Sequence, residues 1–541
     1  MSMPTLLCSA LALSLSLAVN AAVVPDGTTL AKKQYVVINN GAEIQSFDPH
    51  RSEGVPESEV AMQLFEGLTS YDADGNVIPG VAERWESSPD YKTWTFHLRQ
   101  NAKWSDGRPV TANDFVYAWR RLVTPATASP NASFLEYLQV ENVTDVINGK
   151  QKPNALGVEA LDDFTFVVHL QNPVPYAVSL TAHQALLPVP KHVIEQFGDY
   201  WVRPAHIVGN GAYQLKNHIL NEKIEFERNP FYWDNAHTVI DGATFLAIEN
   251  ASTDVARYRA GDLDITASSV PPEQFAKLKK EFPNELFTTK TLATYSYEFN
   301  LEKPPFNDIR VRKALNLALD RHIITDKVLG MGQQPTYVLT PTYINEGGAI
   351  KQPIYSQLPM NERNAQAVQL LEAAGFSKAN PLKFSVLYNT GESHKKIAIA
   401  VASLWKANTK GLVDVKLENQ EWKTYLETRR KGNYQVARAG WLADYDQATT
   451  FLNIYLSHSS NNKPRYRNAE FDRVIADSYA LDKAGREAAY AKAEQILADD
   501  FAFLPMYTYV SPRLVKPYVK GYQARDPQNH ILLRNLYVVS H

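Results

Sequence analysis

The chain has 541 residues, of which 45% are apolar, 21% charged and 11% aromatic, with a formal net charge of −3. These figures predict an ordered globular protein of roughly two to four domains. The charge balance gives no reason to expect a polyanion such as nucleic acid as a partner, and the basic clusters at 277–280 and 429–431 are short enough to be solvated helix faces.

Residues 1–21 have the features of a secretory signal peptide. The run from Leu6 to Val19 is apolar apart from its serines and too short to span a bilayer, and Ala21 ends a stretch that fits cleavage directly after it, although the start of the chain lacks the usual Lys or Arg. The only cysteine, Cys8, follows Leu7 and not a small residue, which argues against a lipid anchor. We therefore expect an exported, soluble mature protein without cysteine, which excludes a disulfide framework, a thiolate zinc site and a cysteine nucleophile.

The first half of the chain predicts strands and a few helices. Alternating or β-branched runs predict strands at 34–39, 93–98, 164–170 and 262–267. A helix is predicted at 115–122, after an N-cap at Thr111, and another at 253–261, ending at Gly261.

Two glycine-containing stretches in this half resemble ligand loops but predict turns. Asp72-Ala-Asp74-Gly75-Asn76 is followed by Val77 where a calcium loop needs glycine, so it predicts the turn of a hairpin. Gly209-Asn210-Gly211 lacks the third glycine of a nucleotide-binding loop, so it predicts a turn with positive φ.

The second half alternates between helix and strand patterns. The pattern predicts helices at 308–321, 364–374, 395–407, 421–430, 468–480 and 484–498, and strands at 382–387, 413–417, 434–437 and 505–510. This rhythm predicts an α/β lobe with a mostly parallel sheet, in which ligands bind beyond the carboxyl ends of the strands. The segment from Gly440 to Asp444 follows the strand at 434–437 and is expected at that edge.

Asp444 stands out within this segment because Trp441, Leu442, Ala443 and Tyr445 surround it in the sequence. Burying a carboxylate among such side chains is unfavourable unless a cation meets it. Arg438 could be that cation, which would make Asp444 a structural ion-pair residue, or a ligand ammonium could fill the role. The residues alone leave both readings open.

The sequence carries no motif of a hydrolase, metalloprotease or nucleotide-binding enzyme. It has no Gly-x-Ser-x-Gly, His-Glu-x-x-His or P-loop pattern, and its 13 histidines are scattered. His394 has no companion at metal-ligand spacing, so a hydrogen-bonding role is expected for it. We expect no catalytic residue, no metal and no cofactor, which favours a binding function.

A resemblance to a known family rests on several ordered motifs. They are residues 79–85 (PGVAERW), 92–99 (KTWTFHLR), 103–107 (KWSDG) and 111–119 (TANDFVYAW), followed by 210–213 (NGAY), 257–261 (RYRAG), 305–310 (PFNDIR) and 419–424 (NQEWKT). In these the chain resembles the family 5 extracytoplasmic solute-binding proteins, the oligopeptide- and dipeptide-binding proteins of ABC importers, from about residue 25 to its end.

The resemblance implies a fold and a division into domains. The fold would be an α/β, bilobed periplasmic binding protein fold (type II, cluster C) with an extra third domain and hinge closure. Lobe I would comprise residues 22–65, 191–292 and 511–541, the extra domain attached to it residues 66–190, and lobe II residues 293–510.

The resemblance also implies a ligand site. Asp444 matches the aspartate that takes a peptide's N-terminal ammonium, and the backbones of Val55, Gly440 and Leu442 match segments that pair with the peptide as added strands. Residues that match positions meeting the peptide's C-terminal carboxylate are Arg429, Arg438 and His394. Further implied pocket residues are Glu53, Glu298, Trp422, Trp441 and Tyr509.

The chain departs from some relatives within this implied site. Asn131, Ala267 and Ser296 stand where those relatives have tyrosines, and Ala293 and Leu442 stand where they have cysteines that could pair. We expect Asn131 and Ser296 to line a wider or differently shaped cavity.

The function implied by the resemblance is peptide capture for import. A periplasmic, monomeric protein of a Gram-negative bacterium would bind short peptides in extended form and deliver them to the permease subunits of an inner-membrane ABC importer. Fold alone does not fix the ligand, so a murein peptide, haem or another non-peptide solute remains an alternative on the same scaffold. A periplasmic peptidase and a chaperone-like protein are alternatives from other classes.

Overall fold

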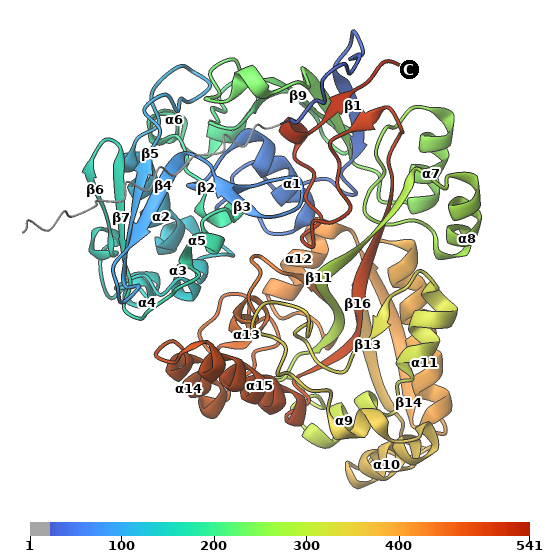
Figure 1. Cartoon of the computed structure of the whole chain (residues 1–541). Helices are drawn as coiled ribbons and strands as arrows, with labels where there is room; N and C mark the ends of the chain where they lie inside the picture. The colour runs from blue at the N-terminus through green and yellow to red at the C-terminus, as the bar shows by residue number, and fades with distance from the viewer. Residues whose placement is uncertain (1–21) are drawn as a thin grey trace, which may run out of the picture.

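The structure is a computed structural model that describes residues 22–541. The predicted signal peptide and Cys8 lie outside these described residues. The described part of the chain contains three large sheets, each built mainly from one region of the sequence (Figure 1).

The first large sheet has four strands in the order β1-β10-β9-β8. The strands are β1 (Tyr35–Asn39), β8 (Tyr213–Ile219), β9 (Lys223–Arg228) and β10 (Gly242–Leu246), with helices α1 (Val55–Leu64), α7 (Ala251–Ala260) and α8 (Pro272–Glu281) in the same region. Helix α6 (Lys191–Phe197) lies beside the second large sheet in Figure 1. The predicted strand at 34–39 and the predicted helix at 253–261 are confirmed, and Gly261 ends the helix with a φ of 83°. The predicted strand at 262–267 is wrong, because only Ile265 makes isolated bridges, to Ile38 and Val515.

The second large sheet has the order β4-β5-β7-β6 and lies apart from the first in Figure 1. Its strands are β4 (Ala82–Ser87), β5 (Thr93–Leu98), β6 (Val158–Asp162) and β7 (Thr165–His169), with helices α2 (Ala112–Val123), α3 (Phe134–Tyr137), α4 (Val143–Ile147) and α5 (Ala177–Leu180). The predicted strands at 93–98 and 164–170 and the predicted helix are confirmed. The Asp114 carboxylate accepts a hydrogen bond from the Thr111 backbone N–H at 2.8 Å, and Phe115, Trp119 and Leu122 bury one helix face.

The two glycine-containing stretches have different outcomes. Strands β2 (Thr69–Tyr71) and β3 (Val77–Pro79) pair antiparallel around Gly75, whose φ is 84°, so the predicted hairpin turn is confirmed. The positive φ predicted at Gly209 and Gly211 is wrong. Glycine is needed there for space, because a Cβ would lie 2.0 Å from the Leu64 carbonyl oxygen at Gly209 and 2.5 Å from the Gln63 carbonyl oxygen at Gly211.

The third large sheet has six strands in the order β12-β16-β11-β15-β13-β14. The strands are β11 (Leu286–Phe299), β12 (Gln334–Pro335), β13 (Leu382–Asn389), β14 (Val413–Gln420), β15 (Val436–Leu442) and β16 (Phe503–Leu514). The region also contains helices α9 (Ile309–Leu317), α10 (Met360–Ala373), α11 (Glu392–Asn408), α12 (Trp422–Arg430), α13 (Thr449–Leu452), α14 (Ala469–Ser478), α15 (Lys483–Asp499) and a π-helical segment (Ile323–Leu329). The predicted helices and strands of this half are all present, although α9 ends at Leu317 and not at 321.

Two expectations about this sheet are wrong. The sheet is mixed and not mostly parallel, since β13 pairs parallel with β14 and β15 whereas β11 pairs antiparallel with β15 and β16. Strand β15 is also longer than the predicted 434–437. Gly440, Trp441 and Leu442 therefore lie within the strand, and Asp444 lies two residues beyond its end.

Strands β11 and β16 connect the upper and lower parts of the molecule (Figure 1). They pair antiparallel from Leu286 and Leu514 to Glu298 and Phe503, with a shift of register between Lys290 and Thr294. A small sheet of β17 (Val519–Lys520) and β18 (Tyr537–Val538) lies near the end of the chain. No helix within residues 22–541 is both long enough and apolar enough to cross a membrane.

Candidate functional site

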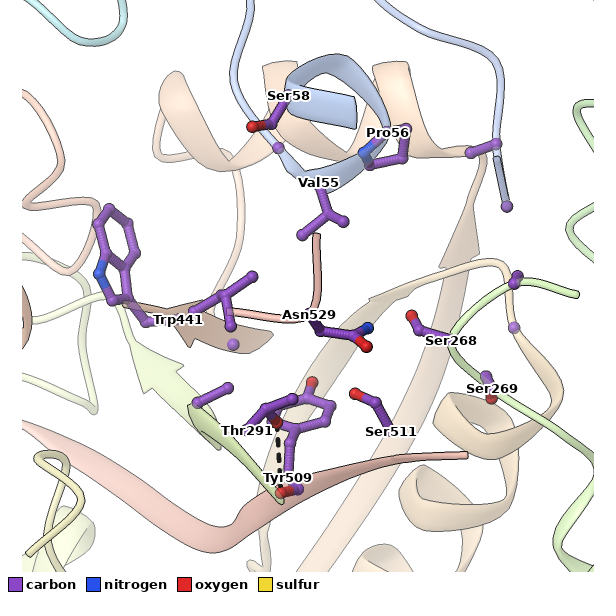
Figure 2. Close-up of a pocket in the computed structure, with 18 of the residues that line it drawn as sticks. Val55, Pro56, Ser58, Ser268, Ser269, Thr291, Trp441, Tyr509, Ser511 and Asn529 are labelled. Atoms are coloured by element: carbon purple, nitrogen blue, oxygen red, sulfur yellow. Dashed lines mark hydrogen bonds between the residues drawn. The ribbon is translucent and has the colours of Figure 1, made fainter. Parts of the chain in front are cut away.

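A cavity of about 490 Å³ lies where the third sheet, helix α1 and segments of the first-sheet region meet. Figure 2 shows part of it, with Val55, Pro56 and Ser58 of α1 on one side, Tyr509 and Ser511 of β16 opposite, and Ser268 and Ser269 beside them. All fourteen residues expected in the ligand site line this cavity: Glu53, Val55, Asn131, Ser296, Glu298, His394, Trp422, Arg429, Arg438, Gly440, Trp441, Leu442, Asp444 and Tyr509. No group of three or more metal-ligating side chains occurs in the part of the chain that the structure describes.

Strand β15 has an open edge toward this cavity. On one side it pairs with β11 from Val436 to Leu442, whereas on the other side β13 pairs only with Val436 and Ala437. The Ala443 N–H donates to the Leu292 carbonyl on the β11 side, and peptide groups alternate between the two sides of a strand. The peptide groups of Gly440 and Leu442 therefore point to the open edge.

Position 440 requires glycine because two side chains lie too close to it for a Cβ. Its φ is not in the left-handed region, but a Cβ would lie 2.8 Å from the Tyr509 hydroxyl and 3.1 Å from Arg438 Nη2. The Arg438 guanidinium donates to that hydroxyl at 2.5 Å. Glycine thus lets this hydrogen-bonded pair lie directly against the strand.

The protein partner of Asp444 is a histidine and not Arg438. His183 Nε2 lies 3.2 Å from Asp444 Oδ1, and the Thr450 hydroxyl is 3.4 Å from Oδ2. The Ala185 N–H donates to His183 Nδ1 at 3.2 Å, so Nε2 carries the ring proton and donates to the carboxylate. The His183 ring stacks on Phe134 with centroids 4.2 Å apart. Sequence reasoning missed His183, which follows the second sheet in the chain and carries no local motif.

Arg438 is half-buried in the cavity wall and has no ion-pair partner among residues 22–541. Besides Tyr509, its guanidinium reaches Asn389 Oδ1 at 3.4 Å and lies 5.1 Å from the centre of the Tyr295 ring. Burial and the adjacent Arg438 hold the pKa of His394 well below its usual range, so His394 is neutral. The positive charge of Arg438 is therefore available to an anion inside the cavity.

The other charged residues of the expected site are already paired. Arg429 Nη2 lies 2.6 Å from Glu298 Oε2, and both side chains are largely buried. Lys463 Nζ lies 3.5 Å from Glu53 Oε2. These four residues line the cavity, but their charges compensate one another.

Val55 and Trp422 face the cavity from opposite regions of the chain. Val55 is 43% exposed. Because it is the first residue of α1, its peptide N–H has no partner within the helix. Trp422 begins α12, and its indole N–H donates to Glu57 of α1 at 3.4 Å. Burial raises the pKa of Glu57 to about 8.

Comparison with known proteins gives the family. The model of the bacterial extracellular solute-binding proteins, family 5 Middle, matches residues 76–463. The chain is 66% identical over 537 residues to the periplasmic oligopeptide-binding protein OppA of Haemophilus influenzae, covering 99% of both chains. The chain belongs to the family 5 solute-binding proteins.

The solved structures of this family share the fold. The crystal structure of Haemophilus influenzae OppA in complex with RPPGFSPFR has a TM-score of 0.94 at 67% identity, covering 94% of this chain and 100% of the other. The resemblance to a bilobed family 5 fold is thereby confirmed.

Two structures of one family 5 relative differ in how closely they resemble this chain. The Escherichia coli murein tripeptide-binding protein MppA has a TM-score of 0.92 at 45% identity, covering 95% of this chain and 100% of the other. An MppA structure described as an unliganded open form has a TM-score of only 0.66 at 44% identity, with 96% and 99% covered. Since the two sequences are about equally similar to this chain, its overall arrangement resembles that of the first MppA structure more closely than that of the one described as open.

The positions at which this chain is expected to depart from some relatives lie around the cavity. Ala267, Ala293 and Ser296 line it with small side chains, and Asn131 donates to the Ser52 carbonyl at 3.0 Å. Ala293 and Leu442 are direct partners in the register of β11 and β15. Cysteines at these two positions would therefore be neighbours across the two strands.

Proposed function

We propose that this family 5 protein captures short peptides in extended form in the periplasm and delivers them to the permease of an inner-membrane ABC importer. The observation that carries the proposal is the open edge of β15, which has an acid beyond one end and an uncompensated guanidinium at the other. The wording of the relatives' names, oligopeptide-binding and murein tripeptide-binding, supports the same ligand class.

The peptide backbone would pair with the open edge of β15. From Arg438 to Leu442 the edge covers roughly 13 Å at about 3.3 Å per residue, which suits a segment of about four residues. Hydrogen bonds between main chains do not depend on side-chain identity, so they support affinity for many sequences. The N–H of Val55, across the cavity, would give a further main-chain contact.

The two ends of the peptide would be recognised by charge. The N-terminal ammonium would bind Asp444, whose carboxylate is held by His183 and Thr450. The C-terminal carboxylate would bind Arg438, with neutral His394 as a hydrogen-bonding neighbour. The ion pairs that contain Arg429, Glu298 and Glu53 would form part of the cavity wall. The side chains of the peptide would contact Trp441, Trp422, Tyr509, Asn131 and Ser296.

We further propose that closure occurs about the paired strands β11 and β16. Lobe I would comprise residues 22–65, 191–292 and 511–541, the extra domain residues 66–190, and lobe II residues 293–510. The boundaries at 292 and 510 fall near the register shift between Lys290 and Thr294, where the ladder is interrupted.

The protein would act as a monomeric binder and not as an enzyme. Native mass spectrometry of the purified protein, followed by identification of the released ligand, tests this function. Peptides of a few residues are expected, and incubation with a peptide mixture should yield no cleavage products. A haem or another non-peptide solute as the retained ligand would contradict the peptide function.

A further inference from the structure

Arg513 is a buried arginine of the cavity wall that the proposed peptide contacts do not use. Its side chain is 4% exposed, and its Nε and Nη1 are sealed from solvent without a hydrogen-bond partner within residues 22–541. Its nearest aromatic contact is Tyr522, with the guanidinium carbon 5.7 Å from the ring centre. A buried guanidinium without hydrogen bonds is unfavourable unless another group meets it.

Strand β16 directs Arg513 toward the same cavity as Tyr509. Residues 509, 511 and 513 alternate along the strand and so share one face. Figure 2 shows Tyr509 and Ser511 pointing into the cavity, and Arg513 also lines it. Arg513 lies roughly 13 Å along the strand from Tyr509, the residue whose hydroxyl accepts from Arg438.

Two acidic side chains near Arg513 accept hydrogen bonds from the backbone. The Glu59 carboxylate accepts the Ile531 N–H at 3.0 and 3.3 Å, and Asp254 Oδ2 accepts the Ala267 N–H at 3.0 Å. Burial raises the pKa of both carboxyl groups to about 7, although the charge of Arg513 opposes this increase. Neither acid comes within ion-pair distance of the guanidinium in the described part of the chain.

The cavity wall to which Arg513 belongs also contains small polar side chains. Ser268, Ser269 and Ser511 line this part of the cavity with small hydroxyl side chains (Figure 2), and Ala267 stands beside them. Asn529 contributes an amide whose Oδ1 lacks a partner among the described residues. A planar guanidinium among small polar side chains suits a carboxylate, which it can bind through two parallel hydrogen bonds.

We propose that Arg513 forms a second anion subsite, separate from Arg438, that binds a carboxylate of the captured peptide and so favours peptides with an acidic residue. This inference rests on the proposed peptide function. The carboxylate belongs to an Asp or Glu side chain or to the main-chain end of a longer peptide, and the two sources are distinguished experimentally.

The test is calorimetry with alanine-based pentapeptides. One set carries a single Glu at each position in turn, with Gln at the same position as the matched control, and a further pair has a free or an amidated C-terminus. The wild type should bind one Glu peptide at least about tenfold more tightly than its Gln counterpart, because hydrogen bonds to charged partners are the stronger ones. Arg513→Met should reduce this preference to below about twofold and leave the affinity for the Gln peptide unchanged.

Two further variants make the result decisive. Ser511→Val keeps the guanidinium but narrows the approach to it, so it should also remove the Glu preference even if Arg513→Met does not fold. Arg438→Met, the matched control, should abolish discrimination between free and amidated C-termini but keep the Glu preference. Loss of the free-terminus preference in Arg513→Met would assign the main-chain carboxylate to Arg513.

The proposal is overturned if the wild type distinguishes neither Glu from Gln peptides nor free from amidated C-termini. It is also overturned if Arg513→Met and Ser511→Val keep the wild-type preference. Absence of binding for every peptide, Gln controls included, would reject the peptide function itself.

Discussion

Replacement of Asp444 by Asn tests the mechanism proposed for the peptide N-terminus. The substitution keeps the size of the side chain and an acceptor for the His183 Nε2–H, which lies 3.2 Å away, but removes the negative charge. The fold should therefore be preserved. Binding of peptides with a free N-terminus should weaken, because the ammonium would enter the closed cavity without a counter-charge.

The magnitude follows from the burial of Asp444. Removing one partner of a buried, hydrogen-bonded charge pair reduces binding by about 2–5 kcal/mol. The Asp444 side chain is 17% exposed, and asparagine retains one polar contact, so we expect the lower end of this range. A loss of about 2–3 kcal/mol corresponds to a dissociation constant roughly 30 to 150 times higher.

The assay is isothermal calorimetry with one peptide in free and N-acetylated forms. Acetylation should weaken binding to the wild type by a similar factor and have little further effect on Asp444→Asn, because both changes remove the same ion pair. Asp446→Asn is the matched control, since Asp446 is exposed and accepts from the Asn345 N–H at 3.0 Å. Equal affinities of the wild type for free and acetylated peptide would refute the role of Asp444.

Three further predictions concern other residues of the site. His183→Phe, which keeps the stacking on Phe134, should weaken binding of free peptides about tenfold relative to acetylated peptides in calorimetry. The hydrogen bond to Asp444 is lost, whereas loss of the acceptor for the Ala185 N–H affects both kinds of peptide alike. Arg438→Met should remove a preference of about tenfold or more for free over amidated C-termini, and equal preferences in the two proteins would contradict this role. Glu57→Gln should increase the free energy of unfolding in urea at pH 8 but hardly at pH 5. Burial raises the Glu57 pKa from 4.5 to about 8, so the stability that its protonated form contributes is present below pH 4.5 and lost as the pH rises through 8; a gain that is the same at both pH values would exclude this explanation.

Local patterns were sufficient to predict most elements of the fold. The helix of residues 112–123 follows from the Thr111 and Asp114 capping pair and its apolar face, and the hairpin at Gly75 follows from turn chemistry. The error at Gly209 has a non-local cause, since the constraint there is the backbone of α1 at Leu64. The mixed character of the third sheet was missed for a similar reason, because its antiparallel strands β11 and β16 are far apart in the chain and their pairing has no local signal.

The positions of the site came from the resemblance, whereas the state of its charges came from the structure. The sequence offered Arg438 as a partner of Asp444 because the two are six residues apart. The structure instead pairs Asp444 with His183, which is 261 residues away in the chain. In the same way Arg429 and Arg438 looked equivalent in sequence, but Glu298 compensates only Arg429. Which charges remain for a ligand is decided by tertiary contacts and cannot be read from motifs.

The distribution of paired and unpaired charges separates two tasks of the cavity wall. The pairs Arg429–Glu298 and Lys463–Glu53 are complete without a ligand, so they can shape the wall without attracting either end of a peptide. Arg438 and Arg513 have no such partner among the described residues. Arg438 donates to the Tyr509 hydroxyl, and Tyr509 lies about 13 Å along β16 from Arg513. An open strand edge accepts many sequences, so selectivity has to come from such isolated charges. Changing Arg513 should consequently alter which peptides are chosen, whereas changing Asp444 should alter whether any peptide with a free N-terminus is held.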